Sequence, residues 1–96
     1  MLKHVVIIKF KAGVGEAEVK DLEGRFAALP GRIPEIREYI FGPDVVRSER
    51  SYDFALVSAF EDVDSLKRYQ VHPDHVALVG RIRELADSIL AVDFCC

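Results

Sequence analysis

The chain has 96 residues, of which 50% are hydrophobic, and it carries a formal net charge of −3. This length suits a single domain over residues 1–96, and the composition is that of a globular protein rather than a disordered one. Its 13 basic residues are scattered, which argues against nucleic-acid binding, and no apolar run reaches the roughly 18 residues of a membrane span.

Three elements are expected in the first half of the chain. The β-branched and aromatic run His4–Lys11 predicts a strand. Apolar residues at helical spacing predict a helix over Glu16–Leu29, which ends at the following Pro-Gly pair. A second strand is expected over Ile36–Phe41, ahead of a Gly-Pro-Asp turn.

Four more elements are expected in the second half. A strand is predicted over Tyr52–Phe60, and Asp62 or its neighbour should cap a short helix that follows. Pro73 should open a further helix, and Ser88–Phe94 should close the chain as a fourth strand. The apolar stripe of the helix opened by Pro73 is expected to comprise Val76, Val79, Ile82 and Leu85.

The expected order β-α-β-β-α-α-β is the split βαβ pattern of a ferredoxin-like α+β sandwich with a four-stranded antiparallel sheet. The strands carry apolar side chains on both faces, whereas the helices of so short a chain cover only one face. A second copy packed sheet against sheet would bury the other face, so we expect a homodimer. The interface is expected to comprise Val5, Ile7, Val57, Leu90 and Val92.

Two of the three histidines lie with a tyrosine in the seven-residue segment Tyr69–His75. Because Pro73 suits the first position of a helix, His75 falls in the first turn, where the helix dipole disfavours a charged imidazole. A neutral imidazole and a phenol can together move a proton on a carbonyl compound. His4 lies on an apolar strand face and would join this pocket if that face lies under the helices. The alternative is structural: the segment is also a helix junction, and a lone histidine on an apolar face commonly serves the core.

The sequence argues against a metal site, a nucleotide-binding loop and a structural disulfide. His72 and His75 are separated by a proline and lack the three or four ligands that zinc takes, so we expect no metal. Gly13–Gly15 has neither the third glycine nor the lysine of nucleotide-binding loops, and no cofactor is expected. Cys95 and Cys96 are adjacent and cannot staple the fold, and the opening residues lack the features of a secretory signal, which predicts a cytoplasmic location.

Two segments resemble one known family. The opening Lys3–Lys11 is similar to the start of the stress-responsive dimeric α/β-barrel (Dabb) family, and Tyr52–Phe60 followed by Tyr69–Val76 resembles its most recognisable block. The resemblance covers Leu2–Phe94. It implies a ferredoxin-like fold and a dimer whose two sheets form a barrel.

For function, the resemblance implies several alternatives. A plant polyketide-cyclase branch uses a tyrosine and a histidine for an aldol-type cyclisation; these match Tyr69 and His75, and a strand-one histidine matches His4. Many other members have no known activity. The first hypothesis is a dimeric binding or stress-associated module with an apolar pocket near Tyr69 and His75 for a small apolar ligand.

Two enzymes are the competing hypotheses. One is a cofactor-free cyclase, lyase or aldol-type enzyme acting on an apolar carbonyl compound, in which Tyr69 donates a hydrogen bond or proton, His75 abstracts a proton and His4 orients. The other is a cofactor-free monooxygenase. A cavity of some hundreds of Å³ lined by these residues favours an enzyme or ligand binder, whereas a filled core with His75 bonded to the backbone favours the module.

Overall fold

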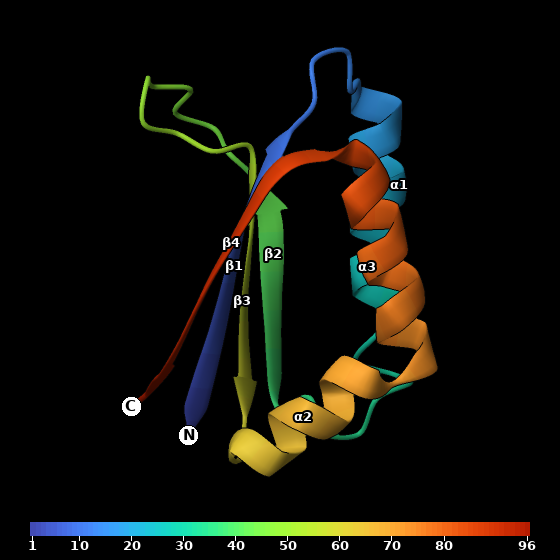
Figure 1. Cartoon of the computed structure of the whole chain (residues 1–96), viewed down its shortest axis with the longest axis vertical. Coiled ribbons are helices and arrows are strands. Elements are labelled where there is room, and N and C mark those ends of the chain that lie inside the picture. The colour runs from blue at the N-terminus through green and yellow to red at the C-terminus, as the bar shows by residue number, and fades with distance from the viewer.

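The structure, a computed structural model, describes all 96 residues from Met1 to Cys96. Four strands form one antiparallel sheet, and three helices lie on one side of it (Figure 1). None of these helices combines the length and the apolar character that crossing a membrane requires. The elements are β1 (Leu2–Phe10), α1 (Glu16–Ala28), β2 (Glu38–Pro43), β3 (Phe54–Phe60), α2 (Val63–Val71), α3 (Pro73–Leu85) and β4 (Ala86–Cys95). The predicted ferredoxin-like α+β order is therefore confirmed.

The largest boundary differences lie at strand ends. β3 begins at Phe54 rather than at Tyr52, because the Asp53 carboxylate accepts the hydrogen bond of the Phe10 N–H at 2.7 Å and takes the place of a backbone partner. β4 begins at Ala86, directly after α3, rather than at Ser88. The predicted cap of α2 is present, since the Asp62 side chain accepts from the Ser65 N–H at 2.8 Å.

The predicted apolar stripe of α3 is wrong at Val76, which is 56% exposed. Leu78, Ile82 and Leu85 are the buried residues of this helix. Their spacing of four and three residues defines one helical face, and His75 lies on the same face three residues before Leu78. The packing of α3 therefore turns His75 toward the sheet.

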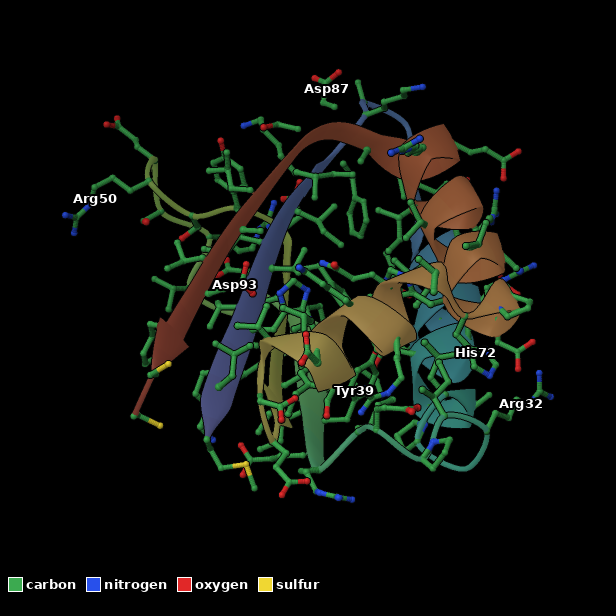
Figure 2. The ribbon with its side chains drawn as sticks, turned by 60° about the horizontal axis from the view of Figure 1, so that its bottom comes forward. Arg32, Tyr39, Arg50, His72, Asp87 and Asp93 are labelled. Atoms are coloured by element: carbon green, nitrogen blue, oxygen red, sulfur yellow. The ribbon has the colours of Figure 1, made fainter.

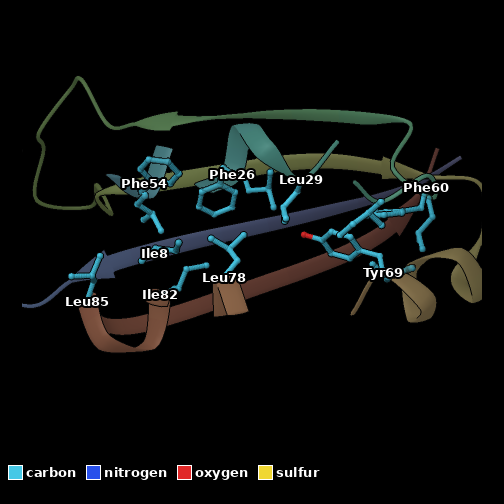
Figure 3. Packing of buried hydrophobic residues seen from close by; sticks show 14 residues of the cluster. Ile8, Phe26, Leu29, Phe54, Phe60, Tyr69, Leu78, Ile82 and Leu85 are labelled. Atoms are coloured by element: carbon cyan, nitrogen blue, oxygen red, sulfur yellow. The ribbon is translucent and has the colours of Figure 1, made fainter. Parts of the chain in front are cut away.

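The core lies between the helices and the inner face of the sheet. Phe26 of α1 is 1% exposed, and its ring stacks on Phe41 at 5.4 Å and on Phe54 at 5.3 Å between centroids. Figure 3 shows this cluster with Ile8 of β1 among the residues beneath α3. Aromatic stacking of this kind adds to the burial of apolar area and fixes α1 on the β2–β3 side.

The outer face of the sheet is apolar and uncovered. The strand order is β2-β3-β1-β4, and the register places Val5 beside both Val57 and Val92. Val57 is 36% exposed and Val92 is 60% exposed, so these apolar side chains face solvent on the outer side of the sheet. The prediction that the helices cover one face only is confirmed.

His72 alone separates α2 from α3. Its backbone is extended (φ −61°, ψ 134°), as the residue before a proline favours, and Pro73 occupies the first turn of α3. Its backbone N–H donates to the Tyr69 carbonyl at 3.2 Å, and its Nδ1 accepts from the Asp74 N–H at 3.1 Å. His72 therefore caps both helices and fixes the bend between them.

Replacing Pro73 with alanine should lower the free energy of unfolding by about 1 kcal/mol, because alanine leaves the unfolded chain more freedom. We also expect the NMR chemical shifts of the Tyr69 and His75 rings to change clearly despite this small loss of stability, because the bend at Pro73 determines the distance between the two rings. Pro30→Ala, at the exposed turn after α1, is the control and should leave both rings unchanged. Denaturant melts would contradict this account if Pro73→Ala lost several times that free energy.

Candidate functional site

Tyr69 and His75 meet across the bend between α2 and α3. Their ring centroids lie 4.2 Å apart at an interplanar angle of 44°. Tyr69 is 1% exposed and also packs on Phe60, with centroids 4.7 Å apart. Figure 3 shows the Tyr69 hydroxyl pointing away from Phe60 into the layer between the sheet and the helices. The two predicted residues are thus in direct contact within the fold.

The Tyr69 hydroxyl has a partner in Tyr39 of β2, and their oxygens are 2.8 Å apart. Burial raises the pKa of Tyr69 to about 12, although the hydrogen bond with Tyr39 acts in the opposite direction. Burial is also the main cause that raises the pKa of Tyr39 above its usual range. Both phenols are therefore neutral at physiological pH and can donate protons in hydrogen bonds.

The backbone determines which nitrogen of His75 carries the proton. His75 Nδ1 lies 3.0 Å from the Gln70 carbonyl oxygen, and because a carbonyl only accepts, Nδ1 is the donor. Burial lowers the pKa of His75, and nearby His4 and His72 lower it further, whereas the bond to Gln70 opposes these effects. The ring is therefore neutral near pH 7, with a lone pair on Nε2.

That lone pair has no hydrogen-bond partner within the protein. Every side-chain nitrogen or oxygen that is fully shielded from solvent does have a partner, so Nε2 is not fully shielded. Nε2 must therefore be reachable by a water molecule. A neutral imidazole in this tautomer accepts hydrogen bonds and can act as a general base.

His4 lies on the inner face of β1, beneath the helices. Its ring centroid is 6.3 Å from that of Tyr69, and the residue is 7% exposed. His4 Nδ1 pairs with a carboxylate oxygen of Asp93, which lies directly opposite on β4. Since a carboxylate accepts, this pair places a proton on Nδ1 and orients the ring.

The sheet register aligns four polar side chains in one row across all four strands. Tyr39 pairs with Ser58, Ser58 with His4, and His4 with Asp93. Ser58 is fully buried and its hydroxyl donates to the His4 carbonyl at 2.9 Å. Figure 2 shows Tyr39 beneath α2 and Asp93 on β4. We call Tyr39, Ser58, His4 and Asp93 the polar row.

The sequence indicated three of the residues in this region and missed three. Tyr69, His75 and His4 are brought together as expected, whereas Tyr39, Ser58 and Asp93 were not predicted. The sequence held one signal for Asp93, an aspartate within an apolar strand, but nothing that paired it with His4. His72 caps α3 by accepting from the Asp74 N–H, and neither residue joins the site. Nowhere in the chain do three or more side chains form a group able to hold a metal ion.

Three surface hollows lie away from these residues. Three hollows of about 700, 390 and 230 Å³ open on the surface, and none is lined by Tyr69, His75 or His4. The first lies at the far end of β1, between the start of α1 and Asp53. The candidate site is instead a closely packed layer in which Tyr69 is buried and His75 is bonded to the Gln70 carbonyl. This is the arrangement that was expected of the module rather than of an enzyme.

We expect His75 to titrate below the 6.5 of an ordinary histidine, and to carry its proton on Nδ1 at pH 7. Long-range ¹H–¹⁵N correlation spectra measure both properties, and His75→Gln assigns the signal. Because the folded state binds the His75 proton less readily than the unfolded state, the neutral imidazole contributes to the free energy of unfolding. This contribution is fully present above pH 6.5 and decreases as the pH falls below it. His75→Gln should therefore lose less stability than the wild type between pH 7 and 5. A titration midpoint of His75 above pH 6.5 would contradict the buried geometry of its ring.

Relatives in bacteria and plants match nearly the whole chain. An uncharacterized protein of Streptomyces coelicolor is 40% identical over 93 residues, which cover 95% of this chain and 96% of that protein. Olivetolic acid cyclase of Cannabis sativa is 27% identical over 95 residues, which cover 97% of this chain and 94% of the cyclase.

A solved structure and a family model also match nearly the whole chain. A dimeric ferredoxin-like protein of unknown function from Thermobifida fusca has a TM-score of 0.91 and 30% identity, over 99% of this chain and 90% of that chain. The model of the Stress Responsive A/B Barrel Domain (Dabb) matches residues 2–96. The chain therefore belongs to the stress-responsive A/B barrel (Dabb) family.

Proposed function

We propose that this protein is a homodimeric binding module in which the closely packed layer between the sheet and the helices opens at Tyr69 and His75 to take up a small, largely apolar compound bearing a carbonyl or enol oxygen. The observation that carries the proposal is the His75 imidazole, whose proton is on Nδ1 and whose unpartnered Nε2 lone pair can accept a hydrogen bond from an enol hydroxyl. The Tyr69 and Phe60 rings beside it supply apolar contact area. Apolar walls with a few directed polar groups are typical of small-molecule sites.

The dimer rests on the outer face of the sheet. Side chains on this face form a continuous apolar surface, because Val5 is flanked by Val57 and Val92, and Ile7 by Leu90. An exposed apolar surface of this kind is uncommon on a monomer. The related protein from Thermobifida fusca is described as dimeric. A second copy of the same face would bury this surface with two-fold symmetry.

Val57→Asp should dissociate the dimer, because it places an unpaired carboxylate in the centre of the interface at a cost of several kcal/mol. Val45→Asp is the matched control, since Val45 is 88% exposed and lies outside the sheet. Sedimentation velocity at micromolar concentration separates the two outcomes. A wild-type protein that sediments as a stable monomer would remove the dimer from this proposal.

A cofactor-free acid–base enzyme is the second candidate. The specific observation that favours it is the contact of a neutral imidazole base with a phenol whose pKa is about 12. Tyr69 would donate to the carbonyl oxygen, His75 Nε2 would take a proton from the adjacent carbon, and His4 would orient the substrate. One relative is named olivetolic acid cyclase. No contact in the structure specifically favours the monooxygenase hypothesis.

Binding and turnover measurements on a panel of aromatic ketones and β-diketones distinguish the two candidates. For the module, Tyr69→Phe should weaken binding of any hit by about 5- to 10-fold, the effect of one neutral hydrogen bond. His75→Ala should do the same only for β-diketones, whose enol hydroxyl can donate to Nε2, and no product should form. For the enzyme, each variant should lose about 10²–10⁴-fold in turnover. Tyr52→Phe removes a hydroxyl outside the site and serves as the control. A hit that binds all four proteins equally would place its site elsewhere.

The proposed compartment is the cytoplasm. Cys95 and Cys96 are exposed and free, and adjacent cysteines are poorly placed to bond with each other. Exposed free thiols persist in reducing compartments, which supports this location.

A further inference from the structure

We propose that Tyr39 is a positioning residue for the Tyr69 hydroxyl: it donates to the Tyr69 oxygen when a ligand is bound, and so directs the Tyr69 proton at a ligand oxygen. The coupling of the two hydroxyls stands on their geometry alone. Its effect on a ligand rests on the proposed function.

Only one proton can lie between two hydroxyl oxygens that are 2.8 Å apart. If Tyr69 donates to Tyr39, its proton is already used and it offers a ligand only lone pairs. If Tyr39 donates to Tyr69, the Tyr69 proton is free for a ligand. The donor in this pair therefore decides whether Tyr69 donates to a ligand or accepts from it.

The two rings are held too firmly for either hydroxyl to leave the pair easily. Tyr69 is 1% exposed between Phe60 and His75. Tyr39 lies on β2 with its ring centroid 6.1 Å from those of Phe26 and Phe41. Packing of this density restricts side-chain rotation, so the proton position, rather than ring movement, distinguishes the two arrangements.

A ligand oxygen that accepts from Tyr69 selects the arrangement in which Tyr39 donates. The chain from Tyr39 to Tyr69 to the ligand is then cooperative, because each donor polarises the next. Negative charge that develops on the ligand oxygen is stabilised through the same chain. The pair thus favours ketones, enolates and phenolates over compounds of equal shape that lack an acceptor oxygen.

The acid–base behaviour of Tyr69 agrees with this role. Burial raises its pKa to about 12, and the hydrogen bond with Tyr39 lowers it. A phenol supported by such a donor is a stronger hydrogen-bond donor than one without it. Removing only the Tyr39 hydroxyl should therefore raise the pKa of Tyr69 without removing any aromatic contact.

The test places 3-fluorotyrosine at position 69, which brings the phenol titration into an accessible pH range and gives a ¹⁹F signal. In the Tyr39→Phe background, the acid dissociation constant at position 69 should fall about tenfold, as expected when a charged oxygen loses one hydrogen bond. Tyr52→Phe, which removes the third tyrosine's hydroxyl, should leave it unchanged. Thermal melts of each protein establish that it is folded. An unchanged titration at position 69 in folded Tyr39→Phe would overturn the proposal.

A pair of ligands of equal shape then tests the effect on binding. Acetophenone has an acceptor oxygen where α-methylstyrene has a methylene group. Tyr39→Phe should weaken acetophenone binding about fivefold and leave α-methylstyrene binding unchanged. Equal loss for both ligands would mean that Tyr39 acts through packing only, and would overturn the positioning role. If the wild type binds neither ligand, the proposed function fails for this class of compound, while the ¹⁹F titration still decides whether Tyr39 supports Tyr69.

Discussion

The antiparallel register of the four strands is the constraint on which the candidate site depends. It brings Tyr39, Ser58, His4 and Asp93 into the polar row, although these residues come from four separate stretches of the chain. A slip of one residue in any pair would turn a polar side chain to the outer face and an apolar one inward. The register also keeps that outer face apolar, so the site and the proposed dimer interface have one structural cause.

Burial then sets the chemistry of the site. Polar groups that are fully buried under the helices need partners: Ser58 donates to the His4 carbonyl, and Tyr69 bonds with Tyr39. Burial keeps the phenols protonated and the His75 imidazole neutral. A set of neutral donors and acceptors against aromatic walls suits an uncharged carbonyl compound better than an ion.

The element order could be predicted from the sequence because each strand and helix has its own local pattern, and Pro73 marks the bend that brings Tyr69 and His75 together. The exposed Val76 could not be foreseen, because an apolar helix offers several stripes and tertiary packing selected the one through Leu78. Tyr39 and Asp93 depend on strand pairing between residues far apart in sequence. Hydrophobic patterns identify strands but do not set the register of distant pairs.

A crystal structure of the wild-type protein soaked with acetophenone would show whether the ligand binds at Tyr69 and His75. We expect two copies joined through the outer sheet faces, with the ligand between β1 and the α2–α3 bend. Its carbonyl oxygen should lie within hydrogen-bond distance of the Tyr69 hydroxyl and its methyl group should face His75 Nε2. Acetophenone in the hollow beside Asp53, or a site at Tyr69 and His75 that stays closed in crystals saturated with ligand, would contradict it.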